Sequence, residues 1–162
     1  MPFFYFALFV PFVMLVFSVA FLFAARSGSR PALYWGFAHM MIAVGFGAPA
    51  LEGYIPIKLQ ALLADGFLLI GAVLYGQALL IRFKAPRYLL LQSGFALVAF
   101  IVVAGAVLIA ESLPLELGLH DAFTCVLWLF PLFVVAPRLR APIDWALAAV
   151  TLMIVLDVIV RN

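Results

Sequence analysis

The sequence predicts an all-α integral membrane protein: a polytopic bundle of six transmembrane helices, forming a single domain over residues 1–162. Three observations support this class. Hydrophobic residues make up 69% of the chain and charged residues only 10%, whereas soluble domains have about 25% charged residues. The apolar runs approach or exceed the roughly 20 residues that cross a bilayer. Basic residues also alternate between successive breaks.

This composition excludes several classes of protein. A soluble domain of 162 residues has too little interior to hide so much apolar surface. Soluble enzymes, nucleic-acid-binding domains and disordered chains are therefore excluded. The single cysteine, Cys125, cannot form a disulfide within the chain.

The first three predicted helices cover about 3–25, 32–50 and 57–83. The first is not a signal peptide, because no basic region precedes its apolar run and the run is long enough to span. Pro31 and Pro56 stand just before the second and third helices, where a preceding helix must have ended.

The last three predicted helices cover about 88–110, 118–136 and 143–160. Each is preceded by a short break that contains proline and charged residues, as expected at turns between helices.

The basic residues define an orientation. The first, third and fifth breaks with their margins hold Arg26, Arg30, Arg82, Lys84, Arg87, Arg138 and Arg140. The second and fourth hold Glu52, Glu111 and Glu116, with Lys58 as the one basic residue. Basic residues collect on the cytoplasmic side of membranes. The N-terminus is therefore predicted outside, and an even number of helices also leaves Asn162 outside.

Ionisable residues at membrane depth are costly and are treated as functional candidates. Asp65, His120, Asp121 and Asp157 fall in the outer half and could converge on a polar cavity open to the outside. A histidine beside carboxylates can titrate near neutral pH, so such a cavity would sense a proton, a cation or a small ligand. His39 lies in the inner half, as a proton-relay or ligand-contact candidate.

Simpler structural roles compete with these hypotheses. His39 can hydrogen-bond to a neighbouring helix. His120 and Asp121 can lie at a helix end in the headgroup zone, where charged side chains reach the interface. Asp157 can pair with Arg161 four residues later. Asp65 is the hardest to explain in this way, because it lies about 12 Å along its helix from the start.

No catalytic residue, metal site or cofactor is predicted. His39 and His120 differ in height by far more than a metal–ligand bond of about 2 Å. The chain contains no H-E-x-x-H, G-x-S-x-G or paired-ligand spacing.

Four aromatic residues stand near the expected helix ends and are predicted to anchor the helices at the membrane interface. They are Tyr34, Trp35, Tyr54 and Trp145.

One stretch resembles a known family. Pro31-Ala-Leu-Tyr-Trp-Gly-Phe-Ala38 follows a basic break, the run Leu59–Gly76 follows a short turn, and Arg82-Phe-Lys-Ala-Pro-Arg87 closes the third helix. This order resembles the N-terminal membrane region of bacterial diguanylate cyclases that carry a GGDEF domain. The resemblance implies a multi-pass sensory region in the bacterial cytoplasmic (inner) membrane that works as a homodimer.

The chain departs from that family because it contains no G-G-D/E-E-F motif. It also reaches the outside after six predicted helices, whereas a cytoplasmic output domain requires an odd number. The resemblance therefore carries the expectation that the chain is truncated before a seventh helix and an output domain of a cyclic di-GMP signalling protein.

Two functions remain open from the sequence. The first is a non-enzymatic sensory and anchoring module whose partners are the bilayer, a second copy and a small ligand or proton, with no nucleic acid. The second is a standalone small transporter or channel, with Asp65 and its neighbours as the coupling site. A lipid-modifying enzyme lacks any recognisable nucleophile–base or metal constellation.

Overall fold

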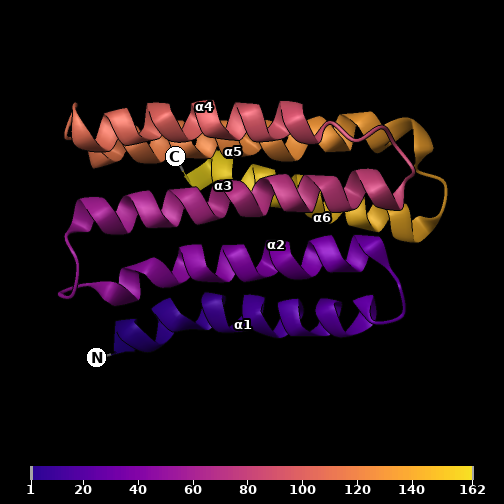
Figure 1. Cartoon of the computed structure of the whole chain (residues 1–162), viewed down its shortest axis with the longest axis horizontal. Coiled ribbons are helices and arrows are strands. Elements are labelled where there is room, and N and C mark those ends of the chain that lie inside the picture. Colours follow the sequence, from indigo (N-terminus) through magenta and orange to yellow (C-terminus); the bar gives the residue numbers. More distant parts are fainter. Residues whose placement is uncertain (1, 162) are drawn as a thin grey trace.

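The computed structural model describes residues 2–161, without the side chains of residues 2–7, 157–159 and 161. Six α-helices run side by side along one long axis (Figure 1). They are α1 (Pro2–Ala25), α2 (Arg30–Gly47), α3 (Ile57–Arg82), α4 (Leu89–Leu108), α5 (Leu113–Val135) and α6 (Pro142–Arg161). Short 3₁₀ turns, Ala48–Leu51 and Ala136–Arg138, follow α2 and α5. The predicted all-α fold is confirmed.

Within the part of the chain that the structure describes, four stretches are long and apolar enough to cross a membrane. They are Leu8–Ala25, Ile57–Arg82, Leu89–Leu108 and Leu113–Arg138. The second and sixth helices of the chain are not among them, so the number of six spans stays a prediction.

The start of α5 corrects the sequence-based boundary. The helix begins at Leu113 instead of 118, because the Ser112 hydroxyl accepts a hydrogen bond from the Leu115 amide. Pro114 lies in the first turn, where its missing N–H costs nothing. His120 is therefore two turns inside the helix, about 10 Å from its start.

The first three helices form a closely packed row. α1 packs on α2, and α2 packs on α3. A Cβ atom at Gly36 would lie 2.7 Å from Leu22, and one at Gly71 would lie 2.7 Å from Ile42. The hydroxyl of Ser18 also donates to the Gly36 carbonyl at 2.8 Å. Small residues at helix crossings allow this close approach within membranes.

The last three helices pack differently. α4 and α5 both contact α3, whereas α6 packs chiefly against α5. Two polar contacts tie α6 to α3: Tyr75 to Thr151 at 3.4 Å, and Arg82 to Asp144 at 3.1 Å. Both ties fall on the first half of α6, toward the end where the loop from α5 enters.

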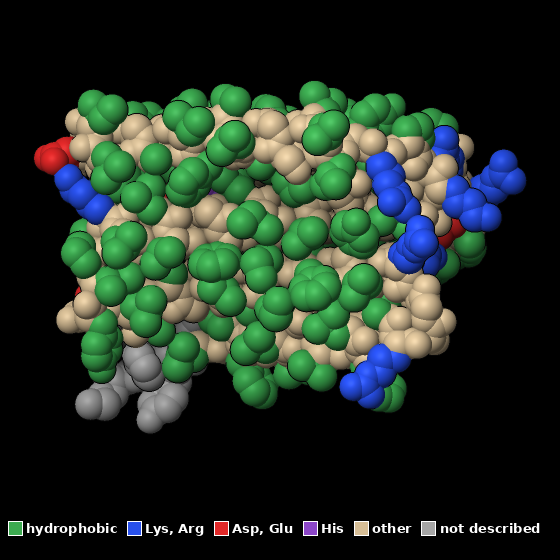
Figure 2. Space-filling view, viewed as in Figure 1, with side chains coloured by type: hydrophobic (Ala, Val, Ile, Leu, Met, Phe, Trp, Pro, Cys, Tyr) green, Lys and Arg blue, Asp and Glu red, His purple; other side chains and the backbone are tan. Residues whose placement is uncertain are grey.

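Charged side chains gather at the two ends of the bundle (Figure 2). The α1–α2, α3–α4 and α5–α6 loops share one end, which carries most of the Lys and Arg side chains. Lys58 and Glu111 pair at the opposite end at 2.6 Å. The surface seen between the two ends is apolar, as a bilayer-spanning bundle requires.

The row of α1–α3 yields a stability prediction. Gly71→Ala would force a methyl group against Ile42 and should destabilise the protein by about 1–3 kcal/mol, the usual cost of overpacking. Gly105→Ala, whose added Cβ meets nothing within 4 Å, is the matched control and should be neutral or slightly stabilising. Unfolding in bicelles measures both, and equal stabilities would contradict the packing described for Gly71.

Candidate functional site

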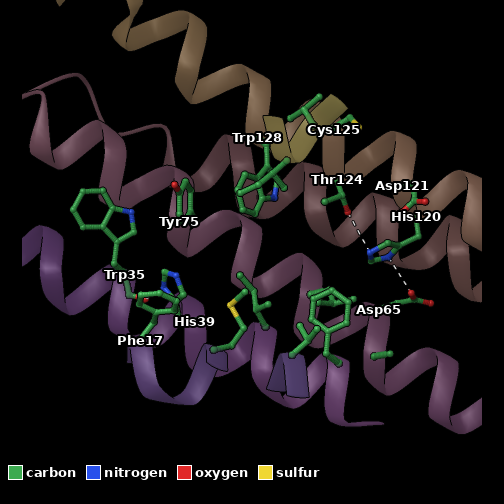
Figure 3. Close-up of a pocket in the computed structure, with 18 of the residues that line it drawn as sticks. Phe17, Trp35, His39, Asp65, Tyr75, His120, Asp121, Thr124, Cys125 and Trp128 are labelled. Atoms are coloured by element: carbon green, nitrogen blue, oxygen red, sulfur yellow. Dashed lines mark hydrogen bonds and ion pairs between the residues drawn. The ribbon is translucent and has the colours of Figure 1, made fainter. Parts of the chain in front are cut away.

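A cavity of about 900 Å³ lies between the helices of the bundle, and α1, α2, α3, α5 and α6 all contribute side chains to its wall. It is partly open at the surface, where Phe17 of α1 and Val150 of α6 are about half exposed. It forms because α6 packs chiefly against α5 and reaches the row of α1–α3 only through contacts with α3, such as those of Thr151 and Asp144. The carboxyl groups and His120 lie at one end of the cavity, and the Trp and Tyr rings lie at the other together with His39 (Figure 3).

The polar end is centred on two buried side chains from different helices. Nδ1 of His120 on α5 lies 2.9 Å from Oδ1 of Asp65 on α3. This is a close contact without the alignment of a hydrogen bond. The hydroxyl of Thr124, one turn further along α5, lies 3.2 Å from Nε2 of His120. Asp65 is 4% exposed and His120 5%, so both groups are withdrawn from the surface.

Glu116 belongs to the same cluster, although the sequence predicts it in the break before the fifth helix. It lines the cavity, is buried, and its carboxyl group interacts with that of Asp65 and with the charges of His120 and Asp121. The earlier start of α5 brings it onto the helix. The spacing of Glu116, His120 and Thr124 at i, i+4 and i+8 would have shown a shared helix face.

The aromatic end joins four helices, since the Phe21 ring of α1 lies 5.6 Å from Trp35 of α2 by centroid. Tyr75 on α3 stacks on Trp128 of α5, with ring centroids 4.5 Å apart and an interplanar angle of 21°. Trp35 and His39 of α2 each lie 6.3 Å from Tyr75 by ring centroid. Nδ1 of His39 lies 2.7 Å from the Trp35 carbonyl oxygen, so this histidine bonds within its own helix.

The structure brings together some of the predicted residues and separates others. Asp65, His120 and Asp121 all line the polar end, whereas His39 lies at the aromatic end. The side chain of Asp157 lies outside the described residues. No group of three or more potential metal ligands occurs among the residues that the structure describes.

The four aromatic residues predicted as interface anchors differ in how far they are exposed. Tyr54 is 86% exposed and Trp145 is 58% exposed. Tyr34 is partly buried, while Trp35 is buried and lines the cavity with its indole N–H unpaired. Trp35 therefore faces the bundle interior, unlike an anchor in the headgroup zone.

Glu111, in the loop between α4 and α5, is paired with Lys58. The hydrogen bond and the charge of Lys58 hold the pKa of Glu111 below its usual range. Glu111 is exposed and does not line the cavity, so it is separate from the buried cluster.

Comparisons with known proteins find no relative of this chain. No protein-family model, no curated protein and no solved structure matches the chain. The resemblance to diguanylate cyclase membrane regions therefore has no support beyond the residues already quoted.

Proposed function

We propose that the chain is a membrane-embedded sensory and anchoring module of a bacterial signalling protein, located in the cytoplasmic membrane. The observation that carries the proposal is the cavity, whose wall joins the row of α1–α3 to α5 and α6 and contains buried ionisable groups. The resemblance to diguanylate cyclase input regions adds a second copy of the chain as the expected partner.

The proposal includes six membrane spans. α2 has 18 residues and α6 has 20, and at 1.5 Å per residue they extend about 27 and 30 Å, close to the thickness of the hydrocarbon core. The end that carries the Lys and Arg side chains faces the cytoplasm, as basic loops do. The N-terminus then lies outside.

Cysteine accessibility tests this orientation. In a Cys125→Ser background, Tyr54→Cys in the α2–α3 loop should react with a membrane-impermeant maleimide on intact cells. Ser27→Cys in the α1–α2 loop should react only after lysis. Both parent side chains are exposed, so accessibility within the protein is matched, and the reverse pattern would overturn the orientation.

The cavity supports sensing because a ligand bound in it would contact both the row of α1–α3 and the helices α5 and α6. A ligand changes a conformational equilibrium only by binding the two states differently. A ligand bound between α6 and the row of α1–α3 binds two states differently whenever the distance between these helices differs between the states. The two polar contacts of α6 with α3 lie on its first half, whereas the described side chains of its second half are held by apolar packing such as that of Val155. We expect this second half to shift more easily.

A proton is the simplest signal that the site can register. The described titratable groups that line the cavity are His39 on α2, Asp65 and Tyr75 on α3, and Glu116, His120, Asp121 and Cys125 on α5. Crowded carboxyl groups in an apolar wall cannot all stay ionised without a counter-charge. Proton uptake at this cluster would change the contacts between α3 and α5.

A distance measurement tests this response. With spin labels at Val44→Cys on α2 and Met153→Cys on α6, in a Cys125→Ser background, the mean distance should change by about 2 Å or more between about pH 8 and about pH 5. The Asp65→Asn, Glu116→Gln double variant should lose the change.

The control pair is Val44→Cys with Ile70→Cys on α3, because α2 and α3 pack directly on each other. Its distance should not respond to pH. A constant α2–α6 distance in the wild-type background would overturn the sensory proposal.

A transporter is the second candidate function, favoured by the same buried acidic cluster, which could couple protons to a substrate. Proton-driven uptake into proteoliposomes that Asp65→Asn abolishes would replace the sensory proposal with this one.

A further inference from the structure

We infer that the cavity binds a hydrophobic organic cation, held by carboxyl groups at its polar end and by aromatic faces at the other. The inference rests on the proposed ligand-binding function and specifies the class of ligand. It follows from the charge, the unpaired atoms, the rings and the size of the cavity.

The wall contains several acidic groups and, among the described residues, no permanently charged basic group. Three carboxyl groups, Asp65, Glu116 and Asp121, line the cavity together with His39 and His120. No Lys or Arg lines it among the described residues. In an apolar surrounding a carboxylate without a counter-charge is costly, so a cationic ligand is favoured and an anionic one is opposed.

An unpaired acceptor marks the place of the cationic group. Oδ2 of Asp65 is buried and has no hydrogen-bond partner in the structure, although the carboxyl group faces Glu116. Buried polar atoms normally have a partner. A positive charge next to Asp65 and Glu116 would compensate these crowded carboxyl groups.

The aromatic rings at the other end of the cavity suit the apolar part of such a ligand. Tyr75, Trp128 and Trp35 are each at most 9% exposed and line the cavity. Aromatic faces attract cations and pack against apolar groups. Asp65 and Tyr75 lie ten positions apart on α3, about 15 Å along the axis, which leaves room for an extended apolar body.

The volume agrees with an organic ligand instead of a metal ion. About 900 Å³ lies within the roughly 300–1,000 Å³ typical of small-molecule sites. Hard metal ions require about six or more oxygen ligands, and no group of three potential metal ligands occurs in the described part of the chain.

Tetraphenylphosphonium and tetraphenylborate are the probes, because they have nearly the same shape and opposite charge. Binding to the whole chain in lipid nanodiscs is measured by equilibrium dialysis, with empty nanodiscs subtracted. Tetraphenylphosphonium should bind saturably, with one site per chain, and tetraphenylborate should show no saturable binding.

Two variants localise the site. Asp65→Asn should weaken tetraphenylphosphonium binding by about tenfold or more, the usual effect of losing a charged partner. Glu111→Gln removes an acidic residue outside the cavity and should leave binding unchanged. Thermal unfolding of each variant shows that it is folded.

The outcomes separate the inference from the proposed function. Absence of saturable tetraphenylphosphonium binding, or equal binding of both probes, would overturn the cation inference, even with a pH-dependent α2–α6 distance. Cation binding that depends on Asp65 would support the inference, even with a constant distance, which counts against the sensory proposal alone.

Discussion

The contact between Asp65 and His120 is the interaction on which the interior of this bundle depends. A carboxyl group inside apolar helices must find a partner within the protein, because lipid offers none. The 2.9 Å contact fixes the level at which α3 and α5 face each other, and Thr124 and Glu116 extend the polar cluster along α5. The space beyond it stays open because α6 packs chiefly against α5, away from α1 and α2.

The fold could be predicted from the sequence because its signals are local. Apolar run length and proline-containing breaks located all six helices within a few residues, except at the start of α5. There Pro114 alone predicts a break, although proline is also favoured in the first turn of a helix. The Ser112 cap settles this choice, and the five-residue shift moves His120 from a helix mouth to the interior.

The candidate site was only partly predictable. The number of residues from each helix end predicts Asp65 and His120 in the same half of the membrane. Whether the two side chains face each other depends on how each helix is rotated about its axis, and counting residues does not give that rotation. Glu116 was missed because its helix was started too late. The aromatic end was missed because Trp35 near a helix end has the same sequence signature as an interface anchor. Its burial against Tyr75 follows from packing between α2 and α3 that no local pattern encodes.

The central claim is that the bundle contains an accessible cavity with an acidic wall that favours cations. The single cysteine, Cys125, lines it and serves as a native probe. The test compares the rates at which a cationic and an anionic methanethiosulfonate reagent of similar size modify Cys125. Tyr54→Cys in a Cys125→Ser background gives the reference ratio of the two rates at an exposed site. The account predicts a cation-to-anion ratio well above that reference, reduced by Asp65→Asn. An equal ratio at both positions, or a Cys125 that reacts with neither reagent, would contradict it.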